Sequence, residues 1–123
     1  MDGERGRIKK FGLWVFVMTY RVYTTDEFDK NFNRLDESDK IRVRKILNQL
    51  RENGDSAGKP LRFPYFREKK FESKRLYFLV YKDYMIVLVV AISDKKTQQE
   101  TIDAIVAELK NYKDIIEKKI REI

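Results

Sequence analysis

The sequence predicts an α+β fold, in which an antiparallel sheet of about four strands carries a helix hairpin near the N-terminus and a long helix at the C-terminus. Three observations lead to this prediction. Apolar residues recur at helical spacing from residue 24 to residue 53, and again from residue 97 onward. Between these regions lie three runs rich in aromatic and β-branched residues. The turns that separate the runs are short enough to require antiparallel pairing.

The first strand is expected to begin at Met18, because Tyr20, Val22 and Thr24 alternate along one face. Residues 1–10 are charged and are expected to form a solvated tail. The apolar run GLWVFV that follows could extend a strand. We therefore interpret residues 1–17 as an N-terminal extension and residues 18–123 as a single domain.

Two helices should follow this strand. Thr24 and Glu27 have the spacing of a capping box, in which each side chain bonds a free backbone N–H of the first helical turn. A second cap within residues 36–39 should start a longer helix that ends at Asn53 and Gly54. The apolar stripes comprise Phe28, Phe32 and Leu35 in the first helix, and Ile41, Val43, Ile46, Leu47 and Leu50 in the second. Helices joined so tightly should form an antiparallel hairpin that lies on the sheet.

The remaining strands are expected at residues 66–71, 75–82 and 84–93, with turns at residues 72–74 and near residue 82. Alternation along the middle strand places Leu76, Phe78 and Val80 on one face, and Arg75, Tyr77, Leu79 and Tyr81 on the other. The third strand is apolar on both faces. It should therefore lie in the centre of the sheet, covered on both sides.

The last helix should run from Thr97 to the C-terminus as one element of some 25 residues. Its apolar stripe comprises Ile102, Ile105, Val106, Leu109, Tyr112, Ile116, Ile120 and Ile123. One interpretation is that the whole helix packs across the sheet. The other is that its isoleucine-rich far half forms a docking or homodimer surface.

Composition removes several classes of chemistry. The 123 residues include no cysteine and no histidine, which excludes Ser-His-Asp and Cys-His triads and the usual zinc sites. Any catalysis must use Lys, Arg, Tyr, Asp, Glu or the backbone, and no acidic cluster suggests a metal or other cofactor. The longest apolar run, residues 85–92, is too short to span a membrane, and the N-terminus has no cleavage site for a signal peptide. We therefore expect a cytoplasmic protein.

Positive charge and aromatic rings concentrate in residues 59–82. This segment contains eight Lys or Arg residues and two Glu residues, so its net charge is +6, compared with +7 for the whole chain. Cations that neutralise phosphates, next to rings that can stack on bases, are typical of nucleic-acid surfaces. Candidate RNA-binding residues in this region are Lys59, Arg62, Lys70 and Lys74. The alternative is an ordinary solvated strand face that resists aggregation.

Four segments in this order resemble the RelE/ParE superfamily of type II toxins, in particular its prokaryotic and archaeal RelE-like members. They are MTYRVYTTDEFDKNFNRL from Met18, GKPLR from Gly58, KRLYFLVY from Lys74 and VVAISDKKTQQETI from Val89, and the resemblance extends over residues 18 to about 105. It implies a small ribonuclease that enters the ribosomal A site and cuts messenger RNA, inhibiting translation. It also implies neutralisation by a cognate antitoxin. Such toxins use Lys, Arg and Tyr where other ribonucleases use histidine, which suits this composition.

The resemblance also implies roles for individual residues. Arg67 and Lys69 match basic groups that contact RNA and assist the base, and Arg75 matches the arginine that stabilises the phosphorane. An antiparallel turn should bring Arg75 near Lys69. Lys95 and Lys96 match basic residues that precede the catalytic C-terminal segment of the family.

The sequence departs from the family pattern at two positions. Gln98 stands where the family often has an arginine, and Ile102 stands where it has a tyrosine or histidine that gives a proton. Tyr77 and Tyr81 are candidates to replace this acid, whereas Gln98 keeps only a capacity to bind RNA. These departures leave a second hypothesis open, a non-nuclease member that binds RNA, the ribosome or another protein, such as a ParE-like inhibitor of gyrase. A homodimer without toxic activity is a third.

Overall fold

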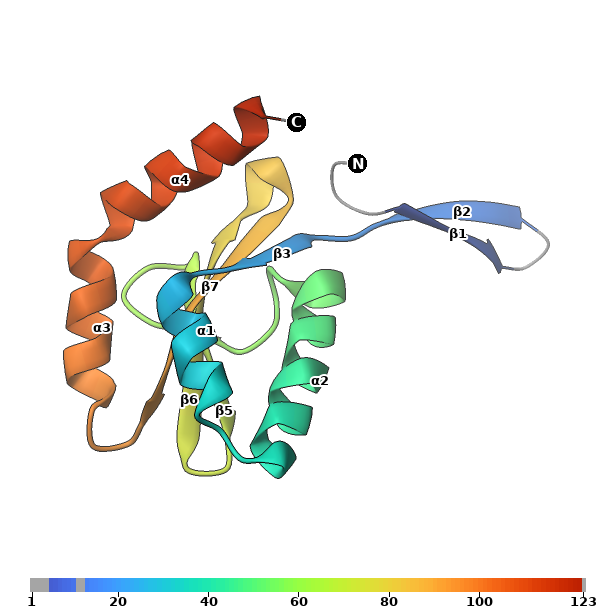
Figure 1. Cartoon of the computed structure of the whole chain (residues 1–123). Helices are drawn as coiled ribbons and strands as arrows, with labels where there is room; N and C mark the ends of the chain where they lie inside the picture. Colours follow the sequence, from blue (N-terminus) through green and yellow to red (C-terminus); the bar gives the residue numbers. More distant parts are fainter. Residues whose placement is uncertain (1–4, 11–12, 123) are drawn as a thin grey trace.

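The computed structural model describes residues 5–10 and 13–122 and contains a mixed sheet of five strands in the order β3-β7-β6-β5-β4 (Figure 1). The strands are β3 (Arg21–Thr24), β4 (Lys59–Pro60), β5 (Phe66–Phe71), β6 (Lys74–Tyr81) and β7 (Ile86–Asp94). The prediction of about four antiparallel strands is wrong in two respects. β4 adds a short edge strand, and β3 pairs with β7 in parallel. Local periodicity contained no signal for either, because β4 has two residues and the direction of β3 is set by a partner far along the chain.

A helix hairpin, α1 (Asp26–Asn33) and α2 (Glu37–Asn53), covers one face of the sheet, as predicted. Its first cap is one residue later than expected. The Phe28 N–H donates to the Thr25 hydroxyl at 3.1 Å, whereas the Thr24 hydroxyl donates to Asp29 Oδ1 at 2.8 Å. The second cap is confirmed, because the Asp39 N–H donates to Asp36 Oδ1 at 2.8 Å.

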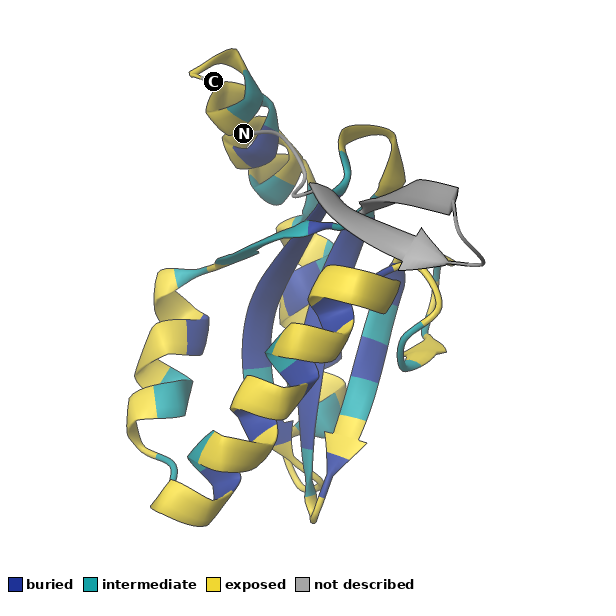
Figure 2. Ribbon diagram, turned by 90° about the vertical axis from the view of Figure 1, so that its right-hand side faces the viewer, coloured by how far each residue is buried: buried dark blue, intermediate teal, exposed yellow. Residues whose placement is uncertain are grey.

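The sheet separates two apolar cores, and Figure 2 shows its buried strands behind helices whose outer faces are exposed. On the hairpin side, Val43 and Leu50 pack with Phe78 and Val87. On the other side, the helices α3 (Gln98–Ala107) and α4 (Leu109–Arg121) cover a cluster made by Phe66, Tyr77, Leu79, Leu88, Val90, Ile105 and Ile116. β7 lies between β3 and β6 and contributes to both cores, which confirms its central position.

The C-terminal helix is not a single rod. It breaks at Glu108, whose φ of −107° and ψ of 10° are outside the helical region, and the chain continues as α4. A straight helix of this length would extend about 36 Å and leave the sheet. The break instead allows Ile116 to be completely buried, while Ile115 stays 51% exposed. The first part of α4 therefore packs on the domain, and the dimer surface stays a prediction.

Two further elements complete the described chain. A 3₁₀ turn, η1 (Lys82–Tyr84), joins β6 to β7, so β7 begins two residues later than expected. β1 (Arg5–Lys10) and β2 (Leu13–Met18) pair antiparallel in a two-stranded sheet of their own, apart from the main sheet in Figure 1. Residues 5–10 therefore form a strand instead of the expected tail, and their solvation stays a prediction. The division of the chain at residue 17 stays a prediction, and residues 1–4 lie outside the described part.

Candidate functional site

A hollow of about 670 Å³ follows the outer edge of β5, and we call it the β5-edge pocket. β4 pairs only with Arg67 and Glu68, so it covers only the first half of this edge. The lining residues come from α2, the loop before β4, β4 itself, β5, β6 and the start of α3. They are Gln49, Asn53, Ser56, Ala57, Gly58, Lys59, Glu68, Lys69, Lys70, Arg75 and Gln98.

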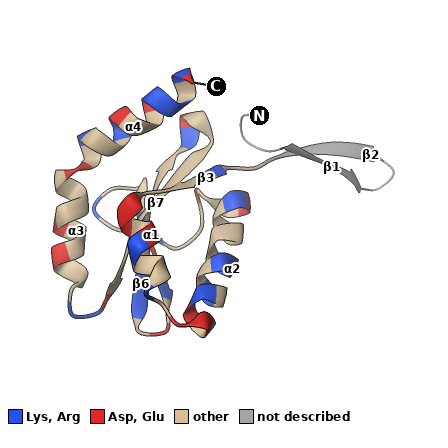
Figure 3. Cartoon of the chain, viewed as in Figure 1, with Lys and Arg blue, Asp and Glu red and all other residues tan. Residues whose placement is uncertain are grey.

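The pocket gathers several of the predicted residues. Lys59, Lys69, Lys70 and Arg75 line it together with Gln98, although they are spread over 40 positions of the sequence. Figure 3 shows cations of β5 and β6 near the turn that joins these strands. Four cations face one carboxylate, so the lining carries a formal net charge of +3. Such a concave basic surface favours a phosphate-bearing ligand.

The register of β5 and β6 decides which side chains share a face. Lys70 pairs with Arg75, and Glu68 pairs with Tyr77. Glu68, Lys70 and Arg75 therefore share the face covered by α3 and α4, because directly paired residues point to the same side.

The turn brings Arg75 near Lys69, as expected, in that both residues line the pocket, but their side chains leave the sheet on opposite faces. Lys69 pairs with Leu76, so it points to the hairpin side and meets Arg75 only around the open strand edge. The reason is the turn. Phe71 pairs with Lys74, which leaves two turn residues instead of the predicted three. A shift of one residue in the pairing changes which β5 side chains share a face with a given β6 side chain.

Glu68 and Arg75 form the innermost charged pair of the pocket. The Glu68 side chain is 7% exposed and that of Arg75 is 11% exposed. Arg75 Nε lies 3.8 Å from Glu68 Oε1, and Lys59 Nζ lies 3.9 Å from Glu68 Oε2. Both distances exceed those of hydrogen bonds. Among the described residues, neither Arg75 Nε nor Glu68 Oε1 has a hydrogen-bond partner.

Arg67 has a different environment from Arg75. Its guanidinium donates from Nε to the carbonyl of Ala57 at 2.8 Å, from Nη1 to Pro64 at 3.2 Å and from Nη2 to Gly58 at 3.3 Å. These bonds hold the loop before and after β4 against β5. The catalytic role expected for Arg67 stays a prediction, and this geometry gives it a structural task.

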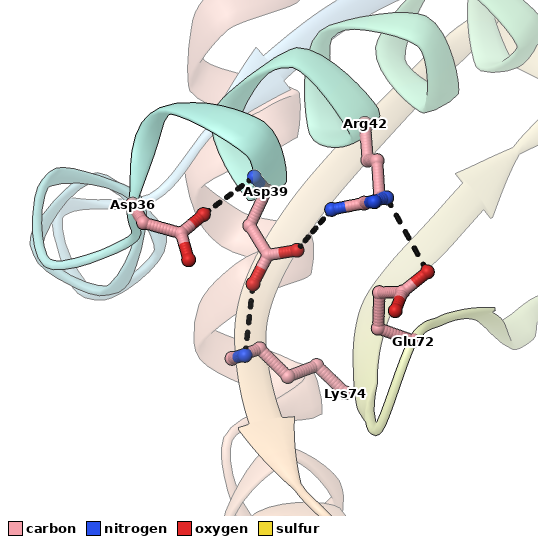
Figure 4. A network of polar contacts seen from close by, with 5 residues as sticks. All are labelled: Asp36, Asp39, Arg42, Glu72 and Lys74. Atoms are coloured by element: carbon pink, nitrogen blue, oxygen red, sulfur yellow. Dashed lines mark hydrogen bonds and ion pairs between the residues drawn. The ribbon is translucent and has the colours of Figure 1, made fainter.

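Lys74 belongs to a polar network at the start of α2 (Figure 4). Its ammonium group donates to Asp39 Oδ2 at 2.8 Å, and Arg42 Nη1 donates to Asp39 Oδ1 at 3.0 Å. The bond from Lys74 holds the pKa of the Asp39 carboxyl below its usual value, and the same bond raises the pKa of Lys74. Arg42 also pairs with Glu72 at 3.4 Å, so the network ties α2 to the β5–β6 turn.

The other basic candidates lie outside the pocket lining. Arg62 pairs with Asp103 on α3. Lys95 and Lys96 are exposed in the turn after β7, where Asp94 Oδ1 accepts hydrogen bonds from Thr97. RNA contacts of these cations stay predictions, and they would require a ligand that extends beyond the pocket.

The two candidate tyrosine acids differ in position. Tyr77 is completely buried, and burial raises the pKa of its phenol. Its hydroxyl lies 2.8 Å from Ser93 Oγ, and Ser93 Oγ lies 3.0 Å from the carbonyl oxygen of Asp94. Tyr81 is six residues from Arg75, about 20 Å along the strand, and burial raises the pKa of its phenol also.

Two further observations complete the site. Ile102, at the position of the expected acid, is buried in the core beneath α3. Sequence analysis missed Glu68, although a Glu two residues before Lys70 in a strand was a signal that the two would share a face. In the part of the chain that the structure describes, no three carboxylates lie close enough to hold a metal ion, and no helix is long and apolar enough to cross a membrane.

Comparison with known proteins identifies the fold. No family model and no curated protein matches the sequence. A double mutant of the Escherichia coli RelE toxin in the free state aligns with a TM-score of 0.60 at 20% identity, over 72% of this chain and 99% of that one. The RelBE2 toxin-antitoxin complex from Mycobacterium tuberculosis aligns with a TM-score of 0.56 at 17% identity, over 63% and 100%. The RelB-RelE complex from Methanococcus jannaschii gives 0.53 at 10%, over 64% and 96%.

Proposed function

We propose that this protein, which has the fold of the RelE toxins, is the toxin of a type II toxin-antitoxin system and acts as a ribosome-dependent mRNA endoribonuclease. The observation that carries the proposal is the β5-edge pocket, where Arg75 lies deep and Lys59, Lys69 and Lys70 surround it. The fold, the charge and the absence of histidine all suit this chemistry.

In the proposed reaction, the 2′-hydroxyl of the messenger attacks the adjacent phosphate. The phosphorane that forms carries additional negative charge, and Arg75 would stabilise it, because its guanidinium lines the pocket in a largely buried position. Lys69 and Lys70 approach from opposite faces of β5 and would bind the flanking phosphates. Gln98 can donate and accept hydrogen bonds at the α3 side of the pocket. No metal is needed for these steps.

The proposed partners are messenger RNA on the ribosome and a cognate antitoxin. RelE structures with this fold are known as complexes with RelB antitoxins. A chain of net charge +7 would attract an acidic antitoxin segment, and one that covered the pocket would block RNA. These partners would place the protein in the cytoplasm.

A non-cleaving member of the fold is the second candidate. The observation that favours it is the absence of tyrosine from the pocket lining, together with the burial of Tyr77 and Ile102. Such a protein would bind RNA, the ribosome or, like ParE, gyrase, without cutting the messenger.

The test is cell-free translation with the purified chain, with cuts in the messenger mapped by primer extension. The proposal expects cuts that require ribosomes. Arg75→Ala should slow them by about 10²–10³-fold, and Lys70→Ala by a smaller factor. Lys45→Ala, which removes an exposed cation of α2 outside the pocket, is the matched control and should cleave like the wild type.

Intact messenger would refute the nuclease. Blocked translation without cuts would then favour a ribosome-binding protein. Inhibition of DNA supercoiling by gyrase, when the purified chain is added, would favour gyrase as the target.

A further inference from the structure

Glu68 is the one acidic residue that lines the β5-edge pocket, and it is largely buried there. Exposed carboxylates on this hairpin are unremarkable, since Glu72 pairs with Arg42 at the surface. A buried carboxylate is costly unless donors satisfy it. Its position among four cations lowers this cost, but Oε1 accepts no hydrogen bond from the described residues.

One oxygen of Glu68 is buried without a hydrogen bond. Oε1 has no hydrogen-bond partner among the described residues, and Arg75 Nε lies 3.8 Å from it. An arginine pair made for stability would usually be bidentate, with distances below 3 Å. The pair as it stands leaves both groups unsatisfied, and a ligand that satisfied them would be favoured.

Glu68 also points in the direction that a reacting base needs. It lies two residues from Lys70, on the same face of β5, and Lys70 pairs directly with Arg75. The carboxylate, the ammonium and the guanidinium therefore converge on one side of the hairpin. A phosphate held by Arg75 and Lys70 would have its neighbouring sugar within reach of Glu68.

We propose that Glu68 is the general base of the reaction and takes the proton of the attacking 2′-hydroxyl. This role rests on the proposed ribonuclease function. As the proton moves to the Glu68 carboxylate, the bond from the 2′-oxygen to phosphorus forms and the bond from phosphorus to the 5′-oxygen breaks. The 5′-oxygen leaves with the electron pair and takes a proton from water, and Glu68 then returns its proton to solvent. The products are a 2′,3′-cyclic phosphate and a 5′-hydroxyl.

Single-turnover cleavage of a ribosome-bound messenger by Glu68→Gln tests this role. Glutamine keeps the size of the side chain and an oxygen that can face Arg75, but it cannot take the proton. We expect cleavage to slow by about 10²–10⁴-fold, as is usual when a general base is removed. Glu72→Gln makes the same change of charge at an exposed site of the same hairpin and should cleave at the wild-type rate.

A binding measurement separates catalysis from support of the fold. The probe is a ribosome complex whose messenger carries a 2′-O-methyl group at the cleaved nucleotide. Glu68→Gln should bind this complex at least as tightly as the wild type, because the pocket loses its one negative charge. Weaker binding together with slower cleavage would show that Glu68 only positions Arg75, and would overturn the proposal.

The two proposals can fail separately. If the wild type and Arg75→Ala behave as expected but Glu68→Gln cleaves within threefold of the wild type, the base is another group and the nuclease function stands. If the wild type leaves the messenger intact, both the function and the role of Glu68 are refuted.

Discussion

Gly58 holds the rim of the β5-edge pocket in a conformation that other residues avoid. Its φ is +66°, in the left-handed region, and a Cβ added there would lie 2.2 Å from the carbonyl oxygen of Glu68. The obstacle is the backbone of β5, which cannot rotate away as a side chain could. Gly58→Ala should therefore displace the segment that leads into β4.

The magnitude follows from three contributions. The left-handed conformation costs an alanine about 1–2 kcal/mol. Displacement would break the Arg67 bond to the Gly58 carbonyl, now 3.3 Å, and strain the pairing of Lys59 with Glu68, at about 1 kcal/mol each. The lower entropy of the unfolded alanine chain offsets about 0.5 kcal/mol. We expect the free energy of unfolding to fall by about 3 kcal/mol.

Urea unfolding followed by circular dichroism measures this change. With an m-value of about 2 kcal/mol per M, the midpoint should move down by about 1.5 M. Ser56→Ala changes an exposed residue of the same loop and should leave the midpoint unmoved. A shift below about 0.3 M for Gly58→Ala would refute the argument, because it would mean that the loop can accept a Cβ at little cost.

Three further predictions concern the scaffold. Asp39→Asn should lower the melting temperature at pH 7. The pKa of Asp39 is depressed in the folded state, so its contribution to stability is present above the ordinary aspartate range and is lost as the pH falls through the folded-state pKa. The gap between the melting temperatures of wild type and variant should therefore narrow as the pH falls below that range, and a constant gap would contradict this. Arg67→Ala removes three hydrogen bonds to backbone carbonyls and should lower the free energy of unfolding in urea by about 2 kcal/mol. Proteolysis within residues 57–64 should become faster, and unchanged proteolysis would show that Arg67 does not hold this loop. Ile116→Ala should lower the free energy of thermal unfolding by about 3 kcal/mol, whereas Ile115→Ala should leave it almost unchanged, because only the Ile116 side chain is fully buried. Equal effects of the two substitutions would show that α4 does not pack on the sheet.

The sequence predicted part of the candidate site. Lys59, Lys69, Lys70, Arg75 and Gln98 were named from charge and from the family resemblance, and the fold brings them to one pocket. What could not be predicted is how they meet. A turn of two residues instead of three paired Arg75 with Lys70. The free energy that selects between such turns is small and depends on the packing of both strand faces.

The competing tasks of individual cations were also hidden. Lys74 and Arg67 are as basic as Lys70 in the sequence, but one bonds Asp39 on α2 and the other bonds the loop carbonyls. The partner of Lys74 is 35 residues away and those of Arg67 are up to 10 residues away, so no local sequence pattern predicts these bonds. Conversely, Glu68 looked like a counter-charge among lysines, and only its burial and its unused oxygen suggest a function.

The sequence by itself determined the kinds and the order of the central elements. Apolar periodicity of 3.6 and of 2 identified the helix hairpin, the β5–β6–β7 meander and the central place of β7, because each element must bury its own apolar face. Only the tertiary structure decided the parallel pairing of β3, the short edge strand β4 and the break at Glu108. These depend on contacts between segments far apart in the chain, whose free energy exists only when both partners are in place. The pocket belongs to this second group, since it forms where β4 stops covering the edge of β5.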